Sequence, residues 1–301
     1  MTPENLFKRI ANKKPLTTSE TKIVEFFQRA HPFLGFENIS SISQEANVSK
    51  ASVTRFVNRL GYNGFNDFLT SVRGELTARM QSPFERYHAH KDQLAKTGFN
   101  YWDICVEASI NNIKETHKRI PAEQMMEAAR ILALCPGHLY VVGQRLAYSI
   151  ANQFWFNANV MRRGVFLLDD HASQMSDLLI NAKASDTMFA VTHFPYNRAT
   201  IDAVRYFSKL GGTIILLTDS QLTPLSQWAK IQLTADVGGI PVIFNRSAMT
   251  TVSEALLIFM AHLLQDKINS RTARAENLCR KFGTYQHGSN ESTKTKRGGN
   301  S

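Results

Sequence analysis

Five short runs of mostly apolar residues in the second half of the chain constrain the fold more than any other feature. They are 139–142 (LYVV), 165–168 (VFLL), 187–191 (TMFAV), 213–217 (TIILL) and 231–233 (IQL), and segments of mixed polarity separate them. Strands of a parallel sheet are buried on both faces and lack polar alternation, and the connecting helices cover the sheet. The pattern predicts an α/β domain with a parallel sheet flanked by helices.

Residues 1–80 differ from this pattern because their apolar residues recur only at helical spacing. After a first amphipathic helix, we expect a short second helix that begins with a capping box formed by Ser41 and Gln44. A tight connection follows, and then a third helix with Ser49 as its N-cap and Gly61 at its end. Two short helices joined by a few residues describe a helix-turn-helix. The sequence therefore predicts an all-α helix-turn-helix domain before the α/β domain.

The polar face of the third helix carries the predicted DNA contacts, because the second helix of a helix-turn-helix enters the major groove. We expect Arg55 to suit a guanine edge, and Arg59, further along, to meet a phosphate. The predicted DNA-binding residues are Ser49, Lys50, Ser52, Thr54, Arg55 and Arg59. A net charge of +10 favours a polyanionic partner. The alternative is a solvated polar face on an ordinary helical bundle with a generally basic surface.

The composition along the chain sets the expected boundaries. We predict a DNA-binding domain over 1–80, a polar linker over 81–100, the α/β domain over 101–280 and a disordered tail over 281–301. A helical hairpin should break at Ile120-Pro121, and one long helix should run from Ser247 to Ile268. No apolar run has the length of a signal or membrane segment, and the three cysteines show no metal spacing. These features favour a cytoplasmic protein with free thiols, no membrane, no metal and no cofactor.

The run ISQEANVSKASVTRFVNRLGYNGFNDF (42–68) resembles the N-terminal domain of RpiR-type regulators, through the capped helix around Arg55 and the exit Leu60-Gly61-Tyr62. The second domain resembles the sugar isomerase (SIS) domain that such regulators carry. Together the two resemblances cover roughly residues 15–278. They imply a five-stranded parallel sheet whose ligand binds at the carboxyl ends of the strands, at the switch point between the first and third strands.

The loops at that edge are expected to bind an anion, because helix N-termini follow both of them. The predicted effector-binding residues are Gln144, Arg145, Thr192, His193, Tyr196, Asn197, Arg198 and Thr200. Members that bind sugar phosphates have Gly-x-Gly-x-Ser after the first strand, whereas this chain has GQRLA (143–147). Many have Ser-x-Ser-Gly-x-Thr after the third strand, whereas this chain has THFPYNRAT (192–200). Arg145 has an alternative partner in Asp169 or Asp170.

Three functions compete at this point. The first is a regulator without catalysis, in which a homodimer or homotetramer binds a double-stranded DNA operator under control of a small anionic metabolite, a sugar phosphate or sugar acid. The second is a sugar-phosphate isomerase, which needs a base such as Glu254, His193 or His171. In the third, the SIS domain serves only for dimerisation. The absence of a second catalytic partner beside any of these bases favours the first.

Overall fold

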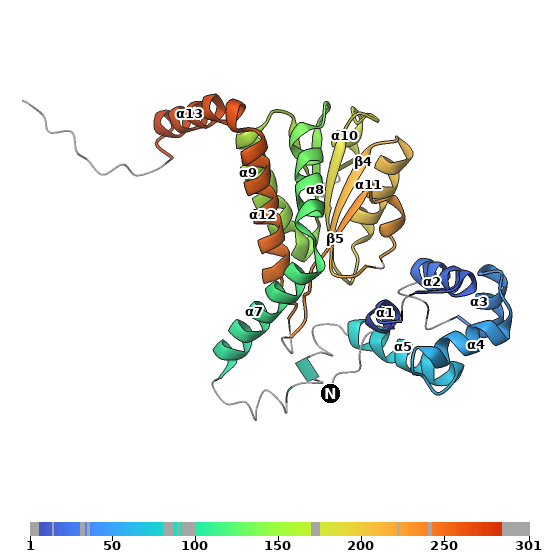
Figure 1. The fold of residues 1–301 in the computed structure, drawn as a ribbon. Helices are drawn as coiled ribbons and strands as arrows, with labels where there is room; N and C mark the ends of the chain where they lie inside the picture. Colours follow the sequence, from blue (N-terminus) through green and yellow to red (C-terminus); the bar gives the residue numbers. More distant parts are fainter. Residues whose placement is uncertain are drawn as a thin grey trace, which may run out of the picture.

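The fold consists of a helical head followed by a sheet with helices on both faces (Figure 1). This computed structural model describes residues 6–13, 15–30, 34, 37–80, 87–88, 91, 100–169, 175–221, 223–239 and 243–284. Most of the predicted linker (81–100) and of the predicted tail (281–301) lies outside the described residues. The predicted fold class, a helix-turn-helix domain followed by an α/β domain, is confirmed.

The head contains α1 (Leu6–Ala11), α2 (Thr18–Ala30), α3 (Ile39–Glu45), α4 (Lys50–Arg59) and α5 (Phe65–Met80). Its core is aromatic: the rings of Phe27 and Phe68 stack with centroids 5.1 Å apart, and Phe56 lies 6.2 Å from Phe27. All three side chains are buried. This core holds α2, α4 and α5 together and turns the polar face of α4 outward.

The cap of α3 differs from the prediction. Asn38 Oδ1 accepts hydrogen bonds from the backbone N–H groups of Ser40 and Ser41, both at 2.9 Å, and the Asn38 N–H donates to Ser41 Oγ at 3.2 Å. The capping box therefore pairs Asn38 with Ser41, and the predicted pairing of Ser41 with Gln44 is wrong. Asn38 has the extended backbone that an N-cap requires, so the helix begins at Ile39.

The sheet has five parallel strands in the order β2-β1-β3-β4-β5. Their bounds are β1 Leu139–Val142, β2 Val165–Leu168, β3 Thr187–Val191, β4 Thr213–Thr218 and β5 Ile231–Thr234. Each predicted strand is present within one residue of its expected bounds. The strand order reverses between β1 and β3, so the predicted switch point is confirmed.

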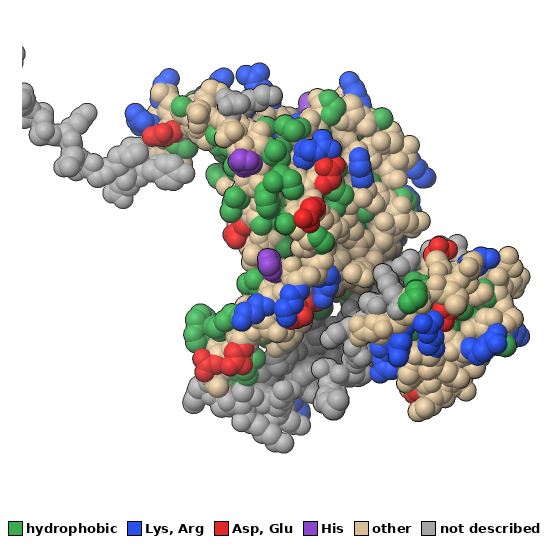
Figure 2. Space-filling model, in the orientation of Figure 1, with side chains coloured by type: hydrophobic (Ala, Val, Ile, Leu, Met, Phe, Trp, Pro, Cys, Tyr) green, Lys and Arg blue, Asp and Glu red, His purple; other side chains and the backbone are tan. Residues whose placement is uncertain are grey.

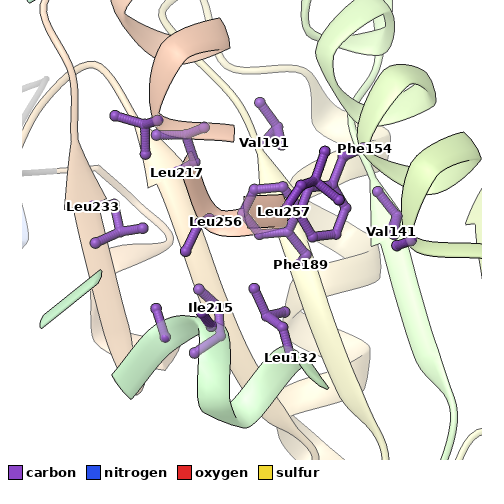
Figure 3. Close-up of a cluster of buried hydrophobic side chains, with 14 of the residues drawn as sticks. Leu132, Val141, Phe154, Phe189, Val191, Ile215, Leu217, Leu233, Leu256 and Leu257 are labelled. Carbon is purple, nitrogen blue, oxygen red and sulfur yellow. The ribbon is translucent and has the colours of Figure 1, made fainter. Parts of the chain in front are cut away.

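Alternate residues of each strand enter two different cores. On one face, Val141 and Phe189 pack with α8 (Ala122–Leu134), α9 (Tyr148–Met161) and α12 (Ser247–Leu263), and Phe154 lies 4.3 Å from Phe189 between ring centroids (Figure 3). On the other face, Val142 and Met188 pack with α10 (Met175–Leu179) and α11 (Arg198–Lys209). Burial on both faces explains why the strands read as continuous apolar runs.

The remaining helices lie at the ends of this domain. The predicted hairpin is confirmed: α7 (Tyr101–Arg119) ends at Ile120 and α8 starts after Pro121. The long helix predicted from Ser247 to Ile268 instead breaks at Leu264, and α13 (Gln265–Lys281) follows it. Within the described residues no single helix has the length and apolarity to cross a bilayer, and one bent pair, α12 with α13, meets those criteria only jointly.

Candidate DNA-binding and effector sites

Helix α4 is fixed at its start by the predicted cap. Ser49 Oγ accepts a hydrogen bond from the Ser52 N–H at 3.1 Å, and the two hydroxyls lie 2.9 Å apart. Val53, Phe56 and Val57 are buried, so the opposite face of α4 is held toward solvent. A small hydroxyl pair at the first turn leaves room for a close approach of another molecule to this end of the helix.

The solvent face of α4 presents two cations. Lys50 and Arg55 are exposed, and Arg55 Nη2 lies 3.5 Å from Ser52 Oγ. The Thr54 hydroxyl donates to the Lys50 carbonyl at 3.1 Å. Figure 2 shows further Lys and Arg side chains on the surface of the helical head. The arrangement suits a negatively charged groove that α4 enters with its N-terminal turns first.

Arg59, at the end of α4, has partners within the protein that the sequence did not predict. Its Nη1 lies 2.7 and 2.6 Å from the two Glu20 oxygens, and its Nη2 donates to the carbonyls of Lys13 and Pro15 at 2.9 and 3.2 Å. Burial raises the pKa of Glu20, but hydrogen bonds from Arg59 and Thr17 outweigh this and lower it overall. Arg59 therefore ties the end of α4 to the start of α2.

Arg9 supports the same end of α4 and was not singled out in the sequence. Its Nη1 donates to the Leu60 carbonyl at 3.2 Å, and its guanidinium lies 4.6 Å from the centroid of the Tyr62 ring. A cation near the C-terminus of a helix is favourable because the last carbonyls have no helical partner. Nothing local in the sequence connects position 9 with position 60, so this contact follows only from the packing.

The loop after β1 combines a required glycine with a strained arginine. A Cβ on Gly143 would lie 2.8 Å from Ala151 Cβ and 2.9 Å from the Ala147 oxygen, so only glycine fits there. Arg145 has φ +53°, in the left-handed region that glycine adopts readily. This position corresponds to the second glycine of the Gly-x-Gly-x-Ser pattern, so the backbone conformation is retained although the glycine is absent.

The surroundings of that loop do not neutralise Arg145. Its side chain is exposed, and none of the described residues provides it with a partner. Asp169 is engaged by the Tyr148 hydroxyl; burial and this carboxylate both raise the pKa of Tyr148. Asp170, the other alternative, lies outside the described residues. Gln144 Nε2 donates to the Leu168 carbonyl, at the end of β2, at 3.0 Å.

The loop after β3 begins in the core. Thr192 and His193 are buried, the Thr192 N–H donates to the Leu217 carbonyl at 3.0 Å, and His193 Nδ1 lies 2.9 Å from the Phe194 oxygen. The Tyr196 hydroxyl donates to Asp219 Oδ1 at 3.3 Å, which joins this loop to the turn after β4. These residues lie at the carboxyl edge of the sheet, and the atoms named above bind the protein itself.

The start of α11 follows this loop. Asn197 Oδ1 accepts from the Thr200 N–H at 3.2 Å and caps the helix. Thr200 has no exposed surface, whereas the Arg198 side chain is 95% exposed and lies 3.5 Å from Asp202. Of the eight predicted effector residues, Arg145 and Arg198 are therefore the accessible cations.

A contact that sequence reasoning missed connects this edge with α7. The Phe244 ring lies 5.1 Å from that of His193, and the next residue, Asn245, is buried and donates to Ser109 Oγ on α7 at 2.9 Å. Ser109 also accepts from Ser247 Oγ at 3.2 Å. The loop after β3 thus touches the segment that is bonded to the first helix of the α/β domain.

The candidate bases are not brought together. Glu254, exposed on α12, accepts from Gln153 Nε2 on α9 at 3.0 Å. His193 is held in the loop after β3, and His171 lies outside the described residues. Glu254 therefore has a structural partner that joins two helices.

Comparison with known proteins supports this architecture. Residues 4–79 match the model of the "Helix-turn-helix domain, rpiR family", and residues 132–259 match that of the "SIS domain". The chain is 26% identical over 255 residues to an uncharacterised HTH-type transcriptional regulator of Clostridium perfringens, which covers 84% of this chain and 87% of that protein.

Two solved structures share the fold. The sugar isomerase domain of an RpiR transcription factor from Sphaerobacter thermophilus superposes with a TM-score of 0.56 at 20% identity, and the match covers 59% of this chain and 99% of that one. NanR from Vibrio vulnificus, solved in complex with ManNAc-6P, superposes with a TM-score of 0.54 at 15% identity over 92% of this chain and 98% of that one. The chain is an RpiR-type transcriptional regulator, in which a helix-turn-helix domain precedes a SIS domain.

Proposed function

We propose that this regulator binds a specific operator through α4 and that a small anionic carbohydrate derivative, a sugar phosphate or sugar acid, controls this binding. The observation that carries the first part is the α4 surface, where Lys50 and Arg55 are exposed beside the small hydroxyls of Ser49 and Ser52. Arg55 reads a base and Lys50 contacts a phosphate. Arg59 acts indirectly, because it holds α4 against Glu20.

The second part of the proposal places the effector at the carboxyl edge of the sheet. Arg145 is exposed, strained and without a partner among the described residues, and Arg198 is exposed near the N-terminus of α11. Strain that persists at an exposed loop is a reason to look for function there. The NanR relative was solved with a sugar phosphate, which supports an anion of that class. Gln144, Thr192, His193, Tyr196, Asn197 and Thr200 shape the loops rather than supply charge.

Two copies of the chain form the active unit in this proposal. Phe156 on α9 and Ile258 on α12 are exposed 60% and 71%, and Figure 2 shows hydrophobic side chains gathered over these helices. Apolar surface of this kind marks association. A pair of chains places two recognition helices on successive half-sites of a pseudo-palindromic operator. The protein acts in the cytoplasm, without catalysis, and divides into domains at 1–80 and 101–280.

The test is competition between DNA from upstream of the gene and random DNA of equal length, at fixed salt, because phosphate contacts alone give tight binding. We expect a preference of about a thousandfold or more for one site. The preferred DNA site is then used to screen sugar phosphates and sugar acids for compounds that release the protein from the DNA. Arg205→Ala, on α11, is the control for Arg55→Ala. Equal affinity for random and upstream DNA, with and without effector, contradicts the proposal.

A further inference from the structure

A concavity lies at the opposite edge of the sheet from the proposed effector loops. Its volume is about 970 Å³, and three loops that lead into strands line it: 133–138 before β1, 161–164 before β2 and 183–186 before β3. Leu264, Ser270 and Arg271, from the junction of α12 and α13, complete the wall. In Figure 1 this end of the domain lies beside α13. None of the residues proposed to bind effector or DNA lines this cavity.

The lining is strongly cationic. Four permanent cations face it, together with an exposed histidine: Arg162, Arg163, Lys183, Arg271 and His138. Among the described residues that line the cavity, Asp186 is the one carboxylate, and its two oxygens accept hydrogen bonds of 2.7 Å from the backbone N–H groups of His138 and Lys183. Backbone amides thus satisfy this carboxylate, which connects the loop before β3 with the loop before β1.

Two of the cations are held rigidly. Arg162 donates to the carbonyls of Leu132 and Gly137, both at 2.8 Å, and Arg271 Nη2 donates to the Asn159 carbonyl at 2.6 Å. Carbonyl partners fix a guanidinium but do not neutralise its charge, so these residues keep a positive potential in the wall. A cation that is already immobilised loses little conformational entropy when an anion binds.

The other two cations are free to bind. Arg163 and Lys183 are exposed, and no described residue is within ion-pair distance of either. Arg163 precedes β2 and Lys183 precedes β3, the two strands on either side of β1, so these cations flank the loop before β1 at the same edge of the sheet. Two exposed cations beside two that carbonyl groups hold in place match an anion that carries at least two charges.

We propose that this cavity, defined by Arg162, Arg163, Lys183 and Arg271, is a second ligand site, which takes a small anion bearing phosphate. The strands between the two edges have four to six residues, so the edges lie roughly 13–20 Å apart at about 3.3 Å per residue. This distance exceeds the reach of one sugar phosphate across the sheet. The cavity is therefore a separate site from the proposed effector site.

The experiment is calorimetric titration of the full chain with pyrophosphate at fixed ionic strength. The double variant Arg163→Gln/Lys183→Gln should bind at least about tenfold more weakly, because both exposed charges of the cavity are lost. The matched control is Lys209→Gln/Lys230→Gln, which removes the same charge from exposed positions of the same domain outside the cavity. Its affinity should stay within about twofold of the native chain. Unchanged thermal midpoints verify that both variants fold.

Two further variants locate the anion. Arg55→Ala and Arg145→Ala remove cations of the proposed DNA and effector sites, and pyrophosphate binding should persist in both. The proposal is overturned if the native chain binds no pyrophosphate, if the control pair loses as much affinity as the cavity pair, or if Arg145→Ala abolishes binding. Operator binding by the cavity variant serves as a separate readout. If it remains intact while pyrophosphate affinity falls, the second site is independent of the head.

Discussion

Replacing Arg145 by glycine should make the α/β domain more stable while it removes the response to effector. A non-glycine residue in the left-handed region costs ~1–2 kcal/mol, and Arg145 has φ +53°. Glycine abolishes this cost. It also has more conformational freedom in the unfolded chain, which lowers the stability of the folded state by ~0.4–1 kcal/mol. The net gain is about 0.5–1 kcal/mol. For a domain of this size it corresponds to a rise of about 1–4 °C in the thermal midpoint.

Arg145→Ala is the matched control, because alanine loses the guanidinium but keeps the left-handed cost. Urea unfolding followed by tryptophan fluorescence measures the difference, since all three tryptophans, Trp102, Trp155 and Trp228, lie outside the head. We expect the glycine variant to exceed alanine in free energy of unfolding by the same net amount of about 0.5–1 kcal/mol, and both variants to lose the effector response. Equal stability of the two variants would refute the assignment of strain. Retained response would refute the role of the guanidinium.

Three further changes test the head and the sheet. Arg55→Ala should weaken operator binding by about 1–3 kcal/mol while affinity for random DNA changes little, as competition binding measures; equal losses on both DNAs would make Arg55 a phosphate contact. Glu20→Gln should destabilise the head by about 1–2 kcal/mol at pH 7 through the lost bonds to Arg59, as hydrogen exchange of α4 amides reports. The pKa of Glu20 is lowered on folding, so its contribution is complete above the ordinary value of 4.5 and is lost as the pH falls through the folded value; a loss independent of pH contradicts this. Gly143→Ala should destabilise the α/β domain by about 1–3 kcal/mol, because its Cβ would lie 2.8 Å from Ala151 Cβ; urea unfolding measures this, and an unchanged midpoint would show that the loop yields.

The sheet was predictable because burial on both faces leaves a direct trace in the sequence. Each run such as 187–191 is mostly apolar, and its neighbours in the sheet are too, so strand positions follow from hydropathy. The recognition helix was predictable for a related reason: Ser49 and Gly61 are local signals at its two ends. Both signals act within a few residues of the feature that they specify.

The features that sequence reasoning missed depend on contacts between distant segments. The ion pair between Arg59 and Glu20 was not foreseen, because the two residues are 39 positions apart and no local pattern connects them. The break at Leu264 was missed because the apolar spacing of α12 continues into Ile268. The conformation of Arg145 was hidden because arginine carries no sequence signal for positive φ, whereas glycine does.

The separation of the hydrophobic cores has a consequence for how such a protein diversifies. The core of the head is made of residues between 6 and 72, and the two cores of the sheet are made of residues between 120 and 264, with no residue in common among those described. A substitution that repacks one core leaves the packing of the others intact. The operator preference and the metabolite preference that we propose can therefore drift at different rates within one lineage, and an exchange of heads between relatives needs compatible linkers rather than compatible cores.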